Sequence, residues 1–206
     1  LVAGDNDITV TGSGEHAVEM VGHFNAGTST FTYASGSETT VEAMDYYSLD
    51  LGNGNRTLSD ANVIGVAKDL IVPETAYTCI VDGSTVEFNG NEKQIIPAFT
   101  FYNLAINDTA MRSNTGSSLN EAYFLELSGD VTVQNNVILT EGVLDTDGHR
   151  LILTNPASSA IGQGYYTSAR RACYINGAIT HSLPENLSSS ATIYYFPVGD
   201  GQDYKP

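Results

Sequence analysis

The chain has 206 residues, and 41% of them are hydrophobic, which is enough to bury a core and argues against a disordered polymer. Its 24 acidic and 8 basic residues give a formal charge of −16. Such a charge repels phosphate backbones and anionic lipid surfaces, so it argues against nucleic acid as a partner. The sequence holds no apolar run of about 18 residues, so we expect no direct insertion into a membrane.

An internal repeat organises the first two thirds of the chain. A weak early copy begins with Ile8-Thr9-Val10, and the first clear match runs from Ser29 to Gly52. The same pattern recurs without a gap 55 residues later, from Ser84 to Asn107. Self-similarity at a period of tens of residues is the signature of stacked units that bury their apolar faces on one another.

The match resumes after an insertion. Ile64-Gly65-Val66 aligns with Val131-Thr132-Val133, and Leu70-Ile71-Val72 aligns with Val137-Ile138-Leu139, now at an offset of 67. The 12 additional residues fall between Thr109 and Phe124, in a polar stretch without periodicity. This stretch is therefore predicted to be a loop that leaves one corner of the repeat.

Short β-rich runs start every six to eight residues between Val131 and Leu153, separated by Asn, Gly and Asp. Alternation such as Val131/Val133 and Leu151/Leu153 places every second side chain inward, as a half-buried strand requires. Three such runs make a coil of roughly 20 residues, the size of a β-solenoid repeat.

The predicted fold is all-β: a parallel β-helix, or β-solenoid, over residues 1–155, with repeat copies at about 29–83 and 84–153. Residues 156–206 are predicted to form a short irregular C-terminal β segment, the start of a further module. The alternative is an antiparallel β-sandwich, which the hairpin signal Asn176-Gly177 favours locally. Sandwich strands usually recur every 8–12 residues, and the spacing here is shorter.

Acidic corners supply the candidate metal ligands. Asp145-Thr146-Asp147-Gly148 and Asp5-Asn6-Asp7 carry closely spaced oxygen atoms, which calcium prefers. Neither completes a twelve-residue calcium loop, and Asp-Gly corners also form plain turns. Asp145 and Asp147 are the calcium candidates, and we expect no other cofactor.

Cys79 and Cys173 are too few for a disulfide framework. Cys79 lies in the strand-like run Tyr77–Val81, which predicts a buried thiol. Whether it pairs with Cys173 in an oxidising compartment cannot be assigned from the spacing, so both states remain open.

Several motifs resemble a known class of proteins. Gly27–Tyr33, Phe101–Asn107, Leu127–Val133 and Gly142–Leu151 are similar to the repeats of large surface and secreted proteins that the type IX secretion system of Bacteroidetes-type bacteria exports. Tyr174–Ile179, followed by Tyr195–Gly201, is similar to a segment that follows those repeats.

The resemblance implies an extracellular or cell-surface location and an adhesin-like or stalk function within a longer chain. The expected partner is a surface glycan or protein. Asp108-Thr109-Ala110 also resembles the O-glycan acceptor pattern of these bacteria, with Thr109 as the attachment residue.

The leading expectation is therefore a non-enzymatic structural or adhesive module. The alternative is a carbohydrate-active or carbohydrate-binding β-helix, such as a polysaccharide hydrolase or lyase, whose carboxylates would be Glu141, Asp145 and Asp147. The chain has no Trp for stacking on sugars, but its 12 Tyr could take that place.

Overall fold

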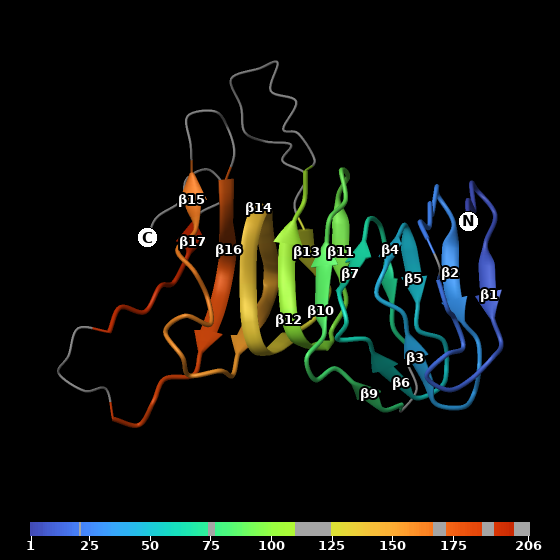
Figure 1. Cartoon of the computed structure of the whole chain (residues 1–206). Coiled ribbons are helices and arrows are strands. Elements are labelled where there is room, and N and C mark those ends of the chain that lie inside the picture. Colours follow the sequence, from blue (N-terminus) through green and yellow to red (C-terminus); the bar gives the residue numbers. More distant parts are fainter. Residues whose placement is uncertain (21, 74–76, 110–124, 167–171, 187–191, 200–206) are drawn as a thin grey trace, which may run out of the picture. The chain divides into compact units, whose positions relative to one another are not determined.

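The computed structural model describes residues 1–20, 22–73, 77–109, 125–166, 172–186 and 192–199 (Figure 1). Every helix-or-strand element within these ranges is a β-strand, so the all-β prediction is confirmed. These ranges accordingly hold no helix long and apolar enough to cross a bilayer. The chain divides into two compact units, Leu1–Phe88 and Asn89–Pro206, which are described separately.

The described residues of the first unit form ten short strands, arranged in three parallel groups. They are β1 (Ile8–Val10), β2 (Thr30–Tyr33), β3 (Thr39–Val41), β4 (Asp45–Tyr46), β5 (Ser48–Asp50), β6 (Arg56–Leu58), β7 (Val63–Val66), β8 (Leu70–Ile71), β9 (Cys79–Ile80) and β10 (Thr85–Phe88). The parallel groups are β1-β2-β5-β8, β3-β6-β9 and β4-β7-β10.

From β2 onward, consecutive strands of the first unit enter the three groups in rotation. Each strand therefore pairs with the strand three places further along the chain, as β2 does with β5 and β5 with β8. Paired residues are 17 positions apart between Thr39 and Arg56 and 23 apart between Arg56 and Cys79. The chain thus pairs with an earlier part of itself after roughly 20 residues, the length expected of one solenoid repeat.

The second unit is built around one long strand. Its strands are β11 (Gln94–Ile96), β12 (Thr100–Asn107), β13 (Leu125–Leu127), β14 (Val131–Leu153), β15 (Tyr165–Tyr166), β16 (Ala172–His181) and β17 (Val198–Gly199). The long strand β14 curls, and it pairs in parallel with β12, β13 and β16 along its length (Figure 1). β15, by contrast, pairs with β16 in the antiparallel direction.

The separate runs expected between Val131 and Leu153 are joined into this single strand. Its ladders shift register at three places: after Val133, after Leu139 and after Asp145. These places coincide with the polar corners of the sequence. Partners on both flanks keep the backbone extended, so the corners become bends within one strand instead of breaks between strands.

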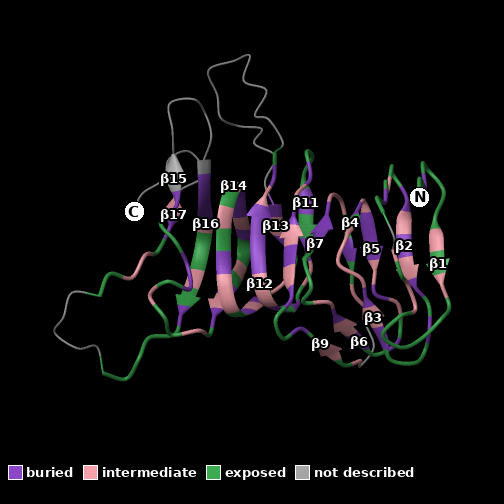
Figure 2. Cartoon of the chain, viewed as in Figure 1, coloured by how far each residue is buried: buried purple, intermediate pink, exposed green. Residues whose placement is uncertain are grey.

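Side chains alternate between the core and the surface as predicted. Val131, Val133, Leu151 and Leu153 are fully buried, and the buried colour recurs along the strands of each unit (Figure 2). In the first unit an aromatic cluster fills the core, with ring centroids 5.3–6.5 Å apart; its members are Phe24, Phe31, Tyr33 and Tyr46.

The sequence repeat is reproduced in the strand boundaries. β2 and β3 recur 55 residues later as β10 and β11, with the same first and last positions. Ser29 and its counterpart Ser84 are both buried, and each hydroxyl donates to the carbonyl three residues earlier, at 2.7 and 2.6 Å. The local conformation therefore repeats together with the sequence.

The pairing register repeats as well. Asp45 pairs with Gly65 and Leu49 with Leu70. Adding 55 to the first residue of each pair and 67 to the second gives Thr100 with Thr132 and Leu104 with Val137, which are also paired. The insertion that separates the two offsets falls in residues 110–124, outside the described part, so its predicted loop conformation stays a prediction.

Asn176-Gly177, the local signal for the antiparallel alternative, forms no hairpin. β16 continues through both residues and remains parallel to β14. Gly177 has a φ of 124°, and a Cβ atom there would overlap the hydroxyl of Thr146. The glycine lets the two strands approach closely. Close packing, and not the need for a turn, therefore explains a glycine at this position. The expected module boundary between residues 155 and 156 stays a prediction.

Candidate functional site

The predicted calcium residues share one corner of β14. Asp145 is half-buried, and its Oδ1 accepts the main-chain N–H of Asp147 at 2.9 Å. Its Oδ2 accepts the Nδ2–H of Asn176 on the neighbouring strand, also at 2.9 Å. Asp147 is exposed and has a φ of 45°, a left-handed conformation that Asp tolerates. The structure thus brings the two residues together in a turn that one carboxylate stabilises.

A second carboxylate lies next to this corner. Glu126 of β13 pairs directly with Asp145 in the parallel ladder, and Glu126 also forms an ion pair with Lys93. The described residues contain no group of three or more His, Cys, Asp and Glu arranged to hold a metal ion. Calcium takes six to eight oxygen ligands, so an ion at Asp145 and Asp147 would draw most of them from water and main chain. Calcium binding here stays a prediction.

Polar side chains at other corners bind the main chain of an adjacent pass. Oδ1 of Asp7, in the other acidic motif, accepts the N–H of Thr30 at 2.9 Å. Asn55 does the same for Thr78 at 3.0 Å, and Asp130 for Arg150 at 2.9 Å. The partners are 20 to 23 residues apart, which is one return of the chain. The sequence therefore contained a signal that the sequence analysis did not use: a polar residue 20 to 23 positions before the residue whose N–H it binds.

A ladder of asparagine side chains runs through the second unit. Nδ2 of Asn135 donates to Oδ1 of Asn103 at 2.9 Å, and Nδ2 of Asn155 donates to Oδ1 of Asn135 at 3.0 Å. The carbonyl of Asn155 accepts a hydrogen bond from Nε2 of His181 at 3.0 Å. Stacked amides satisfy one another when strands align in register. The sequence analysis counted Asn135 among the corner residues and assigned no role to Asn103 or Asn155.

Arg56 has the largest fully buried side chain of the described residues, with 1% exposure. Its guanidinium donates only to main-chain carbonyls: those of Tyr33, Ser35, Ser37, Leu51 and Asn55, at 2.5–3.2 Å. Burial lowers the pKa of the Arg56 guanidinium below its ordinary value. Three of the five carbonyls belong to the corner between β2 and β3, and two belong to the corner between β5 and β6. One side chain therefore holds these two corners together. Nothing in the sequence near position 56 predicts this.

Both cysteines are free thiols, Cys79 in β9 of the first unit and Cys173 in β16 of the second. Cys79 is half-buried and Cys173 is fully buried. Burial raises the pKa of each thiol to about 12, which keeps both protonated at neutral pH. Neither thiol is therefore set up as a nucleophile.

Thr109, the predicted glycosylation residue, is exposed. Its N–H and its Oγ1–H both point to the carbonyl of Gly90, at 2.9 and 3.3 Å. The hydroxyl lies at the surface beside the undescribed residues 110–124. Its modification stays a prediction.

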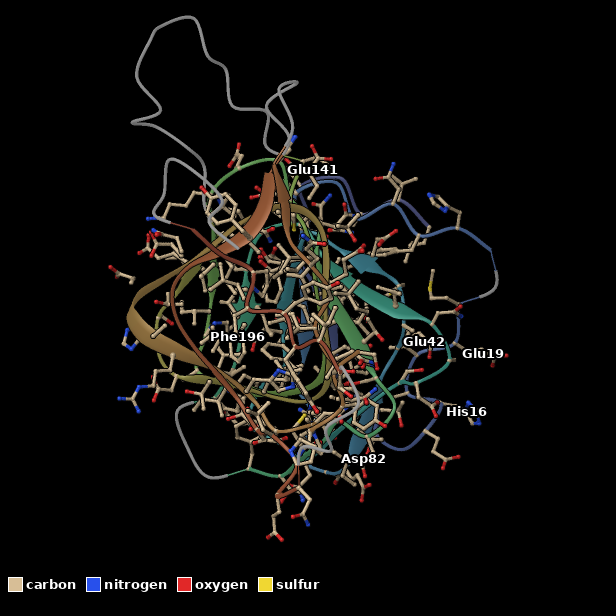
Figure 3. The ribbon with its side chains drawn as sticks, turned by 90° about the vertical axis from the view of Figure 1, so that its left-hand side faces the viewer. His16, Glu19, Glu42, Asp82, Glu141 and Phe196 are labelled. Carbon is tan, nitrogen blue, oxygen red and sulfur yellow. The ribbon has the colours of Figure 1, made fainter. Side chains whose placement is uncertain are left out.

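An aromatic segment packs on one edge of the second unit. Tyr194 and Phe196 contact the ring of His181, with centroids 5.5 and 6.0 Å away. Phe196 remains 40% exposed and lies inside the outline of the ribbon in Figure 3, whereas Glu141 lies at the rim. The ring of Phe196 thus stays partly accessible at the surface of the second unit.

No protein-family model, no curated protein and no solved structure matches this chain. What the site can do chemically follows from its residues. Corner carboxylates and amides bind main-chain N–H groups, a buried guanidinium binds carbonyls, and two acidic residues, Glu126 and Asp145, occupy paired positions on β13 and β14.

Proposed function

We propose that this chain is a non-enzymatic extracellular structural or adhesive module of a larger cell-surface or secreted bacterial protein. Its strands wind as a parallel β-solenoid that acts as a rigid spacer or a binding face. The observation that carries the proposal is the repeated register, in which Asp45–Gly65 and Leu49–Leu70 recur as Thr100–Thr132 and Leu104–Val137.

A repeated register supports a spacer for a physical reason. When each pass of the chain pairs with the pass before it, a further copy adds length without new topology. Each added copy also buries its apolar face on its neighbour, so the core grows with the length. Inward aliphatic residues such as Val66 and Val133, both fully buried at equivalent positions, fit that arrangement.

The corner residues support the same proposal. Asp7, Asn55 and Asp130 each use a side-chain oxygen to hold a main-chain N–H of another pass. Arg56 holds two corners at once. Polar groups that could serve chemistry at the surface are thus engaged in holding the chain to itself.

The extracellular location rests on the resemblance to type IX-exported surface proteins and on the acidic surface, with its formal charge of −16. A surface glycan or protein is the partner proposed for the binding face. The corner insertion and the outward side chains of the strands are where specificity would reside.

A carbohydrate-binding or carbohydrate-active β-helix is the second candidate. The pairing of Glu126 with Asp145 favours it, because two acidic residues occupy paired positions on neighbouring strands, which lie about 4.8 Å apart. Retaining glycosidases use carboxyl groups about 5–5.5 Å apart. The exposed ring of Phe196 adds a stacking surface.

The location is tested with an antibody against this chain on intact cells of the source organism, with and without surface proteolysis. Labelling of intact cells that proteolysis removes supports the proposal. Labelling only after lysis contradicts the extracellular assignment.

Adhesion and catalysis are separated by a glycan array and by hydrolysis assays on acidic and neutral polysaccharides, each with calcium and with chelator. The structural proposal expects no turnover. Turnover that is lost in Glu126→Gln and Asp145→Asn, but kept in the exposed control Asp5→Asn, would establish the second candidate instead.

A further inference from the structure

The chain contains three Asn-Gly pairs: Asn53-Gly54, Asn89-Gly90 and Asn176-Gly177. In such a pair the glycine nitrogen can attack the side-chain Cγ of the asparagine. The new N–Cγ bond replaces the Cγ–NH2 bond, ammonia leaves and a succinimide forms. Water then opens the ring to aspartate or isoaspartate. Glycine favours the attack because it has no Cβ to obstruct the approach.

In two of the three pairs a reacting group is hydrogen-bonded. The N–H of Gly90 donates to Oε1 of Gln94 at 2.9 Å, and Gln94 is 1% exposed. The attacking nitrogen of that pair is therefore engaged and shielded from base. Asn176 lies inside β16, and its Nδ2 donates to Asp145 at 2.9 Å. Attack at either pair requires the local structure to open first.

Asn53 is different. It is exposed, at the corner between β5 and β6. Within the described part of the chain, neither its side chain nor the N–H of Gly54 makes a hydrogen bond. We propose that Asn53 is a site of spontaneous deamidation in the folded protein, and that it reacts before the other two Asn-Gly pairs.

The modified corner is one that Arg56 clamps. Arg56 donates to the carbonyls of Leu51 and Asn55, which lie on either side of Asn53. Gly52 and Gly54 pack so closely on the preceding corner that a Cβ at either would overlap the carbonyl of Tyr33 or Ser35. Isoaspartate inserts an additional methylene into the main chain between residues 53 and 54. The clamped span is then too long for its fixed ends.

The two products therefore differ in effect. Aspartate keeps the length of the main chain and adds one negative charge at an exposed position. Isoaspartate changes the length and strains the hydrogen bonds of Arg56. Deamidation at Asn53 is therefore a slow chemical change with two outcomes. The isoaspartate product loosens the corner, and the aspartate product leaves it intact.

The test is to incubate the folded chain at mildly alkaline pH and follow conversion at all three sites by peptide mapping. Fragmentation that distinguishes aspartate from isoaspartate, and labelling by an isoaspartyl methyltransferase, identify the products. A parallel sample in urea gives the rates without structure. We expect Asn53 to react at least about tenfold faster than Asn89 and Asn176 in the folded protein, because only in those two pairs must a hydrogen bond of the reacting groups break first. In urea the three rates should converge.

Conversion of Asn89 or Asn176 as fast as that of Asn53 in the folded protein would overturn the proposal. So would an Asn53 rate that is at least about tenfold lower in the folded protein than in urea, which would mean that the corner protects it. Two variants check the consequence without depending on the rate. Asn53→Asp should melt within a degree or so of the original chain, and Asn53→Gln, whose amide would have to close a larger ring, should remain unmodified and keep its melting temperature during incubation. An aged sample of the original chain should melt lower in proportion to its isoaspartate content. A melting temperature that follows the total deamidation instead would contradict the role of chain length.

Discussion

The hydroxyl groups of Tyr33 and Tyr46 lie 2.9 Å apart in the core of the first unit. Tyr46 donates its proton to the carbonyl of Glu42 at 2.8 Å, and the N–H of Glu42 donates to the oxygen of Tyr33 at 2.9 Å. Tyr33 must then donate to Tyr46. The two hydroxyls and the main chain of Glu42 thus form a closed ring of hydrogen bonds, in which each donor is determined. Burial raises the pKa of both tyrosines.

Removing one hydroxyl should break this ring. Tyr46→Phe leaves the carbonyl of Glu42 and the hydroxyl proton of Tyr33 without their partners, so we expect a loss of about 1–3 kcal/mol in the free energy of unfolding. Denaturant titration measures it. Tyr47→Phe, at the neighbouring half-exposed ring, should change stability by less than about 0.5 kcal/mol. A double-mutant cycle with Tyr33→Phe should give a clearly non-additive sum, and strict additivity would show that the two hydroxyls are not coupled.

Replacing Arg56 should be among the most damaging single changes in the first unit. Arg56→Met removes every donor to five carbonyls, and hydrogen bonds to charged groups contribute about 1.5–3 kcal/mol each. We expect a loss of at least about 3 kcal/mol, or failure to fold. Arg56→Lys keeps three donors and should retain part of the stability. The exposed Arg150, changed to Lys, is the control, and an equal loss there would contradict the role assigned to the clamp.

A comparison of two glycines distinguishes the cost of lost close packing from the cost of a left-handed backbone conformation. Gly52 and Gly148 both have positive φ, 61° and 83°. A Cβ at Gly52 would overlap the carbonyl of Tyr33, whereas nothing lies within 4 Å of a Cβ at Gly148. Gly148→Ala should cost only the left-handed conformation, about 1–2 kcal/mol. Gly52→Ala should cost clearly more by thermal or denaturant unfolding. Similar losses would mean that the corner can move apart.

Stability should fall in alkaline solution. An unfolded cysteine loses its proton near pH 9, whereas burial raises the pKa of Cys79 and of Cys173 to about 12 in the folded chain. Between these values the folded state binds more protons, so the free energy of unfolding decreases as pH rises. We expect the melting temperature to decline above pH 9, and more steeply beyond pH 10, where the raised pKa values of Tyr33 and Tyr46 add to the effect.

The double variant Cys79→Ala/Cys173→Ala isolates the thiols in that pH experiment. Its melting temperature should stay level between pH 9 and pH 10 and decline only above pH 10. A decline identical to that of the original chain would assign the effect to other groups.

Two positions of β14 test which side chains of the strand point into the core. Val133 is fully buried, and Ile138 is 41% exposed. Val133→Asp buries an unpaired carboxylate and should prevent folding or cost more than about 4 kcal/mol. Ile138→Asp should cost less than about 1 kcal/mol by the same denaturant titration. A severe loss at both positions would contradict the register of the strand.

The repeat and the alternation made much of the strand pattern predictable. The offset of 55 predicted where β10 and β11 would begin once β2 and β3 were known, because equivalent residues meet equivalent neighbours. Alternation at Val131/Val133 predicted inward side chains, since successive residues of a strand point to opposite faces. The polar corners were located correctly, although they bend one strand instead of ending it.

The contacts of individual polar residues were not predictable in the same way. Arg56 receives its acceptors from Tyr33, Ser35 and Ser37, about 20 residues earlier, and local sequence does not reveal which carbonyls will converge. Asn176-Gly177 has the composition of a turn, but strand pairing on both sides decided its conformation. The predictions for Asp145, Asp147 and Thr109 concern ligands and modifications, which strand geometry alone does not test.

The repeated register has a genetic consequence. An in-frame duplication of one copy would present edges whose hydrogen-bonding groups already match those of the original, so the chain could be extended by recombination without compensating substitutions. In the spacer proposed above, the length would then depend on copy number, which selection can adjust one duplication or deletion at a time.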